Sequence, residues 1–561
     1  MNALEKGSKY IEDLVERILC QIDHDVLSPT YGCAHVSYWR DKTSDNADTR
    51  MQEVCFTLAM LYKYDLASNK YRNDVNVLTT ISALLQYWAS TQYSDGSFDE
   101  WYKGERAYAA CAFSIHAVSR TVYLLRDDLG EELLKKIMNS IDLGCKWLSQ
   151  RKDLFKTNHE AVGIAALTFG AKVLEDEKYL RVAQEKVDFL LSTQQKEGWF
   201  KEIGQLDIGY TFLTVEYLLM ANELIQSERL FKLAAKAFDF ACEWLRPNFS
   251  HNGDHSICHN TYISSIAIIK LCGKNSYASF LYQHILLDDL EHKKIINTGD
   301  DLRLMRWSFL SVLAELYARE VKTIADIQKP SLFQITHISN EYYISSAGLL
   351  KRTVNGLPVV IGIFCGGSVE MISHNGSVLN NCGYAIIDET NNKYSSLTYN
   401  KNLNYTLSDD HSQLKISVPI VAIKKFTPNF YQRFILQLIS QMAWSSKAFR
   451  ILIDKYRKHK GSALNQSSAN LSGDSNMLLV RVVGSSGKDL IIKDEIRINK
   501  SLNSKKIFHL FKDENNKEQL VPINKHTCNI TNKIEIEKVY QAQGCWEEMS
   551  PNQINEKLCV E

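Results

Sequence analysis

The sequence predicts an α+β protein of two parts, an N-terminal (α/α) toroid over residues 1–328 and a large antiparallel β-sandwich over residues 329–561. In the first part, apolar residues recur at three- and four-residue spacing, as in helices. Helix-ending motifs also repeat there at intervals of about 40 to 60 residues, the length of a helical hairpin. In the second part, short β-branched runs are bounded by Gly, Asn and Asp, as in strands.

Length and charge narrow the class of protein. A chain of 561 residues is too long for one ordinary core, so two large domains are expected. Lys plus Arg and Asp plus Glu are equal at 65 each, so no net field attracts nucleic acid. We therefore expect no nucleic-acid partner.

The expected compartment is the cytoplasm. Residues 10–19 form an amphipathic helical pattern with charges throughout rather than an apolar signal core. No segment approaches the roughly 18 uncharged apolar residues of a membrane span. The 13 cysteines are scattered without CxxC spacing, which indicates reduced thiols.

The helical part consists of repeated hairpins. Each of four motifs ends a first helix, and a loop and a second apolar helix follow it. The motifs begin at Trp88, Trp147, Leu190 and Trp244, and the second helices are expected at 108–125, 161–174, 210–224 and 262–271. A last helix is expected at 302–317. Hairpins of this period stack into a solenoid or close into a ring. Aromatic-rich loops on one side favour the ring, with a central cleft.

A helical insertion is expected near 430–460, within the strand-rich part, followed by a Ser- and Asn-rich loop at 461–475. The insertion has an apolar face and a basic C-terminal end. It could rest on an anionic membrane, which would make the protein peripheral to the inner membrane. The alternative is a helix packed on the sandwich.

The repeat aligns polar residues from distant parts of the chain. In a toroid, the loops before the second helices lie at one end of the ring and face one cleft. The polar residues of these loops are Glu105 and Arg106, Asn158 and His159, Asp207 and Tyr210, and His255 and His259. We expect the cleft also to include Trp101, Tyr102 and Trp199 as surfaces for sugar rings, and Arg303 and Arg306 from the last helix.

Asn158, His159 and Tyr210 suggest proton transfer on a sugar acid. The α-proton of a carboxylate is very weakly acidic, and donors that neutralise the carboxylate lower the barrier to its removal. An amide and an imidazole can be such donors. A phenol, with a pKa of about 10, becomes a base when a nearby cation lowers that value.

Each of these residues also has a structural interpretation. Asn158 could be a helix N-cap, and Tyr210 a core aromatic. Trp101 and Trp199 could pack between helices. The four-residue spacing of His251, His255 and His259 invites a metal site, but the turn signal at 252–254 argues against a continuous helix. Asp300 and Asp301 are expected to cap a helix. The sequence requires no cofactor, and it leaves open whether the protein binds a divalent metal.

At these residues the sequence resembles the heparinase II/III-like family, polysaccharide lyases and relatives with an α/α toroid and an antiparallel β-sandwich. The specific part is Asn158-His159 followed by Tyr210. Further motifs look like cytoplasmic members linked to bacterial surface-polysaccharide gene sets. These are Tyr31-Gly32-Cys33 with Ser37-Tyr38-Trp39, residues 95–101 with Glu105-Arg106, and Asp207-Ile208-Gly209-Tyr210.

The resemblance implies roles for these residues. Asn158 and His159 would hold a uronate carboxylate, and Tyr210 would remove the C5 proton and protonate the leaving oxygen. Lyases of the family use a further histidine in the β domain, which His374 matches only loosely.

Three functions remain open from the sequence. The leading one is a lyase that cleaves a uronate-containing oligo- or polysaccharide by β-elimination. A uronate C5-epimerase begins with the same proton abstraction, and a cytoplasmic location would favour it. A noncatalytic glycan-binding or assembly factor is the third.

Overall fold

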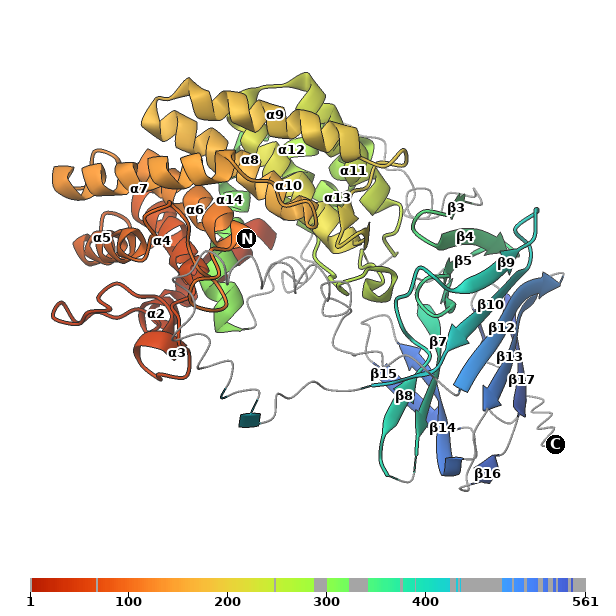
Figure 1. Cartoon of the computed structure of the whole chain (residues 1–561). Coiled ribbons are helices and arrows are strands. Elements are labelled where there is room, and N and C mark those ends of the chain that lie inside the picture. The colour runs from red at the N-terminus through yellow and green to blue at the C-terminus, as the bar shows by residue number, and fades with distance from the viewer. Residues whose placement is uncertain are drawn as a thin grey trace.

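The computed structural model describes residues 3–66, 69–246, 249–286, 300–321, 342–373, 377–388, 390–423, 430–431, 434, 477–486, 489–498, 502–512, 518–522, 528–530, 533–542 and 546–547. Helices make up the N-terminal part and strands the C-terminal part (Figure 1). The predicted fold class, a toroid followed by an antiparallel β-sandwich, is confirmed.

The helices close into a ring. Its inner members are α4 (Val54–Lys63), α6 (Tyr108–Leu125), α8 (Thr157–Leu174), α10 (Ile208–Ile225), α12 (Ser265–Leu271) and α14 (Asp301–Glu320). Each packs against the next, and α14 packs back against α4. Because that last contact joins the two ends of the series, the helices form a toroid rather than an open solenoid.

A second layer of helices surrounds the ring. It contains α5 (Val75–Ser90), α7 (Glu131–Ser149), α9 (Glu177–Thr193), α11 (Glu228–Cys242) and α13 (Ser276–Leu281). Helix α9 buries a stripe that includes Ala183, Val187 and Leu190, whereas α10 is buried around most of its circumference. This difference is expected, because an outer helix has one face in water and an inner helix has neighbours on all sides.

Shorter elements complete the helical part. They are α1 (Ala3–Asp13), α2 (Val15–Leu19), α3 (Val36–Trp39), the 3₁₀ helices η1 (Thr49–Glu53) and η2 (Gly253–His255), and the π-helical turn η3 (Tyr282–Leu286). A hairpin of β1 (Lys201–Glu202) and β2 (Gln205–Leu206) lies directly before α10. This hairpin positions the candidate site.

The β-sandwich consists of two antiparallel sheets. One has the order β18-β17-β13-β12-β10-β9, and the other β11-β8-β7-β6-β5-β4-β3 with β14 paired to β7 and with β15 and β16 paired to β14. The strands are β3 (Tyr342–Ile344), β4 (Leu349–Val354), β5 (Leu357–Gly362), β6 (Ser368–Ile372), β7 (Val378–Ile387), β8 (Lys393–Ser395), β9 (Asn404–Leu407), β10 (Leu414–Pro419), β11 (Val421–Ala422), β12 (Met477–Ser486), β13 (Asp489–Ile498), β14 (Leu502–Lys512), β15 (Glu518–Pro522), β16 (Cys528–Ile530), β17 (Lys533–Ala542) and β18 (Trp546–Glu547).

Strand β5 joins the cores of the two parts. Successive side chains of a strand point to opposite faces of its sheet. Val359 and Ile361 accordingly lie in the sandwich core, whereas Val360 lies in the core of the toroid. The sheet of β5 is therefore covered on one face by the second sheet and on the other by helices.

Two buried ion pairs connect the parts. Arg246 follows α11 in the chain, and its Nη2 lies 2.6 Å from Glu370 Oε2 on β6. Lys512 Nζ, at the end of β14, lies 2.7 Å from Asp254 Oδ1 in η2. Breaking a buried pair leaves an uncompensated charge, so these contacts favour one relative placement of toroid and sandwich.

Two expectations lie outside the described residues. The predicted boundary at 328/329 falls between Glu320, where α14 ends, and Tyr342, where β3 begins. Most of the predicted insertion at 430–460 also lies outside, and its proposed membrane contact stays a prediction. Of that segment, Phe430, Tyr431 and Phe434 are described, with exposed fractions of 75%, 74% and 54%.

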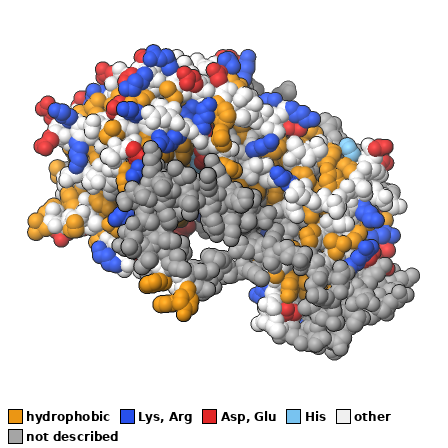
Figure 2. Space-filling model, viewed as in Figure 1, with side chains coloured by type: hydrophobic (Ala, Val, Ile, Leu, Met, Phe, Trp, Pro, Cys, Tyr) orange, Lys and Arg blue, Asp and Glu red, His pale blue; other side chains and the backbone are white. Residues whose placement is uncertain are grey.

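The helical half has a mixed surface. Figure 2 shows Lys and Arg side chains interspersed with Asp and Glu over the helices on the visible face. This agrees with the balanced composition of the chain. None of the described helices is both long and apolar enough to cross a membrane.

Candidate active site at the N-terminal ends of two inner helices

Asn158, His159 and Tyr210 lie on the first turns of two neighbouring inner helices. Helix α8 begins at Thr157 and α10 at Ile208, and the two helices pack along each other. The β1–β2 hairpin links their starts, because a bridge joins Glu202 to Lys156 just before α8 and β2 leads directly into α10. The structure therefore brings the three residues to the same end of the ring.

Asn158 binds a carboxylate, and that carboxylate belongs to the protein. Its backbone N–H donates to Glu202 Oε1 at 2.7 Å, and its Nδ2 donates to Glu202 Oε2 at 2.9 Å. Asn158 is 1% exposed. The N-cap of α8 is Lys156, without a side-chain hydrogen bond, so the N-cap interpretation of Asn158 is wrong. Glu202, from another segment, satisfies the amide near the helix start.

His159 is oriented by Asp153. Its Nδ1 lies 2.8 Å from Asp153 Oδ2, so the carboxylate accepts the Nδ1 proton and leaves Nε2 as the second position. Burial lowers the pKa of His159 below its usual 6.5, although Asp153 acts in the opposite direction. At neutral pH the ring is therefore uncharged, with Nε2 as an acceptor.

The loop that carries Asp153 is fixed by a buried ion pair. Lys186 Nζ on α9 lies 2.8 Å from Glu160 Oε2 and donates to the carbonyl of Arg151 at 2.6 Å. Glu160 Oε1 in turn accepts from the backbone N–H of Asp153. These bonds tie the loop to the outer helix and hold Asp153 against His159.

Tyr210 is placed by the cap of α10. Asp207 is the N-cap, and its Oδ1 accepts from the backbone N–H of Tyr210 at 2.8 Å. No described residue forms a hydrogen bond with the Tyr210 hydroxyl. Burial, with negative charge from Asp207 and Glu202, raises the pKa of Tyr210, whereas Arg50 lowers it. The resting phenol is therefore neutral.

A buried network of charges lies beside these residues. The guanidinium of Arg50 lies 3.6 Å from the ring centroid of Phe113, and the Phe113 ring contacts the imidazole of His159. Arg50 Nε donates to Glu53 Oε1 at 2.7 Å, and its Nη1 lies 3.7 Å from Glu100 Oε1. Arg50 thus lies on the Phe113 ring that packs against His159, and its charge lowers the pKa of Tyr210.

Arg306 of α14 belongs to the same network. Its Nη1 lies 3.0 Å from Glu100 Oε1, and its Nη2 pairs with Asp48. The guanidinium also lies 5.5 Å from the ring centroid of Trp101, which is 67% exposed. Trp101 therefore presents an open aromatic surface beside a buried cation, and its stacking on a sugar stays a prediction.

Glu105 and Arg106 organise the loop that carries Trp101. Glu105 Oε2 accepts from the backbone N–H of Trp101 at 2.7 Å. Arg106 Nη1 lies 2.7 Å from Asp95 Oδ2, and its guanidinium lies 4.7 Å from the ring centroid of Tyr93. Tyr102 is half-buried in the same loop. Direct contact of these residues with a ligand stays a prediction.

Three predicted substrate-binding residues are buried in the protein, and their contact with a ligand stays a prediction. Trp199, 1% exposed, packs in the toroid core near Phe240. Asp207 is 0% exposed, and its second oxygen accepts from the backbone N–H of Cys258 at 3.0 Å. His255, 2% exposed, lies under β5 of the sandwich, where an added Cβ on Gly362 would meet its ring.

The remaining predicted residues lie apart from this group. His259 Nδ1 lies 3.2 Å from Asp254 Oδ1, beside Lys512 of the sandwich. Arg303 lies near the start of α14, where Asp300 accepts its backbone N–H at 2.7 Å. Asp300 is therefore a helix cap, as predicted. His374 lies outside the described residues.

The histidines of this region do not form a metal centre. Among the described residues, no group of three or more His, Cys, Asp or Glu side chains could hold an ion. His251, 0% exposed, faces the carbonyl of Tyr262 at 3.4 Å rather than a shared centre with His255 and His259.

Four site residues were not predicted from the sequence: Asp48, Arg50, Asp153 and Glu202. The hairpin that presents Glu202 follows the turn at Glu197-Gly198, a local signal that could have located it. Asp153 lies six residues before His159 in a loop, and no periodicity marks such a contact. Asp48 and Arg50 lie near the site only because the helical ring closes, which brings the start of the chain beside α14.

Comparison with known proteins supports the fold. No family model and no curated protein sequence matches the chain. The Streptomyces coelicolor A3 chondroitin AC lyase solved with chondroitin sulphate aligns with 97% of this chain and 78% of that one, at a TM-score of 0.53 and 7% identity. A Paenibacillus xanthan lyase aligns with 91% of this chain at a TM-score of 0.50 and 8% identity.

These matches differ in coverage. The chain spans 46% of the length of the xanthan lyase, about half of it. Heparinase III aligns at a TM-score of 0.46 and 9% identity, over 96% of this chain and 90% of that one. The chondroitin AC and xanthan lyase matches show that the protein has the fold of these polysaccharide lyases, and the resemblance read from the sequence is confirmed at the level of the fold.

Proposed function

We propose that the protein acts on a uronic-acid-containing glycan, in which Tyr210 removes the C5 proton and the glycosidic bond at C4 breaks by β-elimination. The observation that carries this proposal is the placement of His159 and Tyr210 on the first turns of the neighbouring helices α8 and α10, whose starts are linked by the β1–β2 hairpin. The lyase fold of the chain supports it.

The resting protonation states favour a defined order of proton transfers. Tyr210 is a neutral phenol with a raised pKa, and His159 is a neutral imidazole whose Nδ1 is bound to Asp153. Nε2 of His159 takes up a proton from solvent when the substrate carboxylate binds, because a negative charge favours imidazolium over imidazole. The imidazolium then lowers the pKa of Tyr210, and the phenol loses its proton to water before it reacts with the substrate.

The chemistry follows from that pair. The phenolate removes the C5 proton, and the electrons move onto the carboxylate, where the imidazolium of His159 and the nearby guanidinium of Arg50 stabilise the added charge. The C4–O4 bond then breaks, and O4 takes the proton from Tyr210, which regenerates the phenolate. Trp101 offers an exposed ring for a neighbouring sugar.

Asn158 has an indirect role in this proposal. Its amide is bound to Glu202, so it fixes the first turn of α8 and thereby the direction of His159. Glu202 also holds the β1–β2 hairpin against that turn. The substrate carboxylate therefore meets His159 rather than Asn158.

The test is incubation with a panel of uronate polysaccharides and oligosaccharides in D₂O. The proposal predicts a product with an unsaturated, ultraviolet-absorbing end. Deuterium at C5 without chain cleavage would identify a C5-epimerase instead. Binding with neither cleavage nor exchange would identify a noncatalytic glycan-binding protein.

A further inference from the structure

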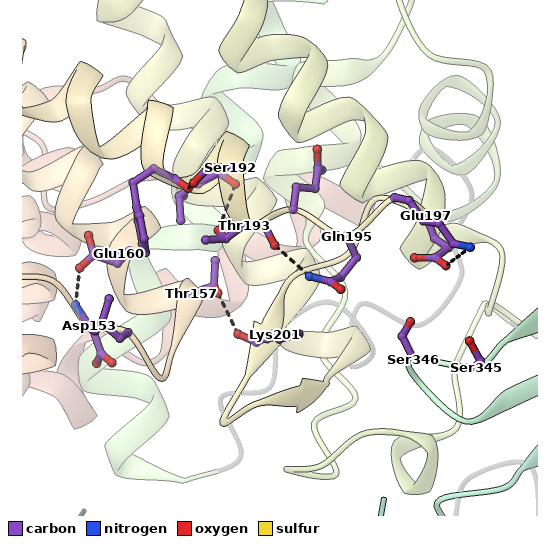
Figure 3. A pocket seen from close by; sticks show the side chains of 15 residues that line it. Asp153, Thr157, Glu160, Ser192, Thr193, Gln195, Glu197, Lys201, Ser345 and Ser346 are labelled. Carbon is purple, nitrogen blue, oxygen red and sulfur yellow. Dashed lines mark hydrogen bonds and ion pairs between the residues drawn. The ribbon is translucent and has the colours of Figure 1, made fainter.

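A cavity of about 570 Å³ lies outside the group formed by His159, Tyr210 and Arg50. Its walls come from the C-terminal end of α9, the loop before α8, strand β1 and the turn between β3 and β4 of the sandwich (Figure 3). Its volume is inside the range of about 300–1,000 Å³ typical of small-molecule sites. Both parts of the protein therefore contribute to one cavity.

Strand β1 separates this cavity from the candidate active site. Glu202 points toward Asn158, with which it forms two hydrogen bonds. The preceding residue, Lys201, lines the cavity, as expected for neighbouring residues of a strand. Thr157 Oγ1 donates to the carbonyl of Lys201 at 2.8 Å and fixes the strand to the start of α8 (Figure 3).

The helical wall of the cavity offers hydrogen-bond acceptors. The hydroxyl of Ser192 donates to the carbonyl of Phe189 at 2.7 Å, and that of Thr193 to the carbonyl of Leu190 at 3.1 Å. Gln195 Nε2 donates to the carbonyl of Thr193 at 3.0 Å. Because these donors are used within the helix end, the oxygens of the three side chains remain as acceptors.

The opposite wall offers donors. Lys201 Nζ and the hydroxyls of Ser345 and Ser346 have no hydrogen-bond partner among the described residues, and all three residues are exposed. Figure 3 shows Ser345 and Ser346 on the sandwich turn, across the cavity from Gln195 and Thr193. A ligand with hydroxyl groups on several sides can bond to both walls, since each hydroxyl donates and accepts.

The charges of the lining favour an uncharged ligand. The acidic groups Asp153 and Glu160 are already paired with His159 and Lys186, and Lys196 lies 3.8 Å from Glu197. Among the described lining residues this leaves Lys201 as the one cation without an acidic partner, rather than a cluster of such cations. The half-exposed ring of Phe189, which has Lys152 Nζ at 4.6 Å from its centroid, adds an apolar surface to the lining.

We propose that this cavity binds an uncharged pyranose residue of the glycan. The claim that this sugar is part of the substrate rests on the proposed function. The claim that the cavity binds a pyranose does not. Asp153 lines the cavity and also holds His159 through its Oδ2. An occupant of the cavity would therefore contact the same loop that orients the imidazole.

The test is saturation-transfer NMR with free glucose, galactose, mannose, N-acetylglucosamine and N-acetylgalactosamine as separate probes. Ser346→Trp fills the cavity from an exposed turn, and Ser485→Trp, on an exposed end of β12, is the matched control. Gln195→Ala removes one acceptor without added bulk. We expect transfer to at least one pyranose in the native protein and in Ser485→Trp, loss of it in Ser346→Trp, and a weaker signal in Gln195→Ala.

Two results would overturn the proposal: no transfer to any of the five sugars, or transfer that both Ser346→Trp and Gln195→Ala leave unchanged. The outcome is separable from catalysis. If no uronate glycan is cleaved or exchanged but the pyranose signal depends on Ser346 and Gln195, pyranose binding by the cavity is supported and the proposed function is contradicted. If cleavage occurs without a pyranose signal, the proposed function is supported and pyranose binding by the cavity is contradicted.

Discussion

Asp153 Oδ2 lies 2.8 Å from His159 Nδ1, in a loop that Lys186 and Glu160 bind to the outer helix layer. The contact fixes the imidazole so that Nε2 is the position open to proton exchange. It also opposes the burial that lowers the pKa of His159, because a nearby carboxylate favours the charged ring. The pair therefore prepares His159 to take up a proton when a second carboxylate arrives.

Binding of a uronate should be coupled to proton uptake by His159. The free ring has a pKa below 6.5 and is neutral at pH 7.5, and a bound carboxylate raises that pKa. Affinity should therefore fall as pH rises between the free and bound pKa values. Calorimetric titration of a uronate oligosaccharide in buffers of different ionisation enthalpy measures the uptake.

Asp153→Asn tests the partner of His159. The variant keeps an acceptor for Nδ1 but loses the negative charge, so proton uptake should decrease and affinity should fall by about tenfold, the equivalent of one pKa unit. Asp188→Asn, at an exposed position on α9, is the control. Equal proton uptake in the native protein and Asp153→Asn would contradict this role.

Arg50 should be needed for stability as well as for the site. Its side chain is 7% exposed and neutralises Glu53, which is 1% exposed. Arg50→Ala leaves that carboxylate buried without its partner, so the free energy of unfolding should fall by about 3–5 kcal/mol. Urea denaturation measures the change.

The control for Arg50 is a surface pair. Arg126→Ala removes the partner of Glu175, which is 76% exposed, and should cost no more than about 1 kcal/mol. A loss in Arg50→Ala no larger than that of the control would show that Glu53 does not need the cation.

Glu216 should make stability depend on pH. It is fully buried on α10, where the hydroxyls of Tyr262 and Ser264 donate to Oε2. Burial raises its pKa from 4.5 to about 7. Between those values the folded protein holds a proton that the unfolded chain has lost, so stability falls as pH rises from about 4.5 to 7.

The Glu216→Gln variant isolates that contribution. It cannot titrate, so its free energy of unfolding should lose the part of the pH slope due to Glu216, on the order of 3 kcal/mol over the interval. Chemical denaturation at several pH values gives both curves. Parallel curves for native protein and variant would disprove the assignment of the slope to Glu216.

The sequence was informative where periodicity determines structure. Apolar spacing predicted α6 at 108–125, as found, and placed α10 and α14 within three residues of their observed ends. The repeat also predicted that loops before α8 and α10 meet at one end of the ring. Periodic burial is a local property, so a single sequence can reveal it.

The burial of a predicted site residue differed from expectation where a side chain can face two ways. Trp199, expected to stack on sugars, follows a turn like the one before Trp101, yet it lies in the core while Trp101 is exposed. His255 was aligned with cleft residues, but the sandwich covers it. Which face a loop residue takes depends on what packs over it, and that neighbour comes from a distant part of the chain.

The partners of the site residues were also beyond the sequence. Asn158 was expected to hold a substrate carboxylate, and its amide does bind a carboxylate, that of Glu202. The chemistry of the residue was recognised but not its partner. Tertiary contacts over 44 residues leave no pattern in one sequence.

The measurement that tests the central claim most directly is deuterium incorporation at C5 of a bound uronate by native protein and by Tyr210→Phe, with Tyr123→Phe, at an exposed position on α6, as the control. Incorporation is followed by mass spectrometry together with the unsaturated product. We predict exchange and cleavage in the native protein and the control, and neither in Tyr210→Phe. Undiminished exchange in Tyr210→Phe would contradict the account.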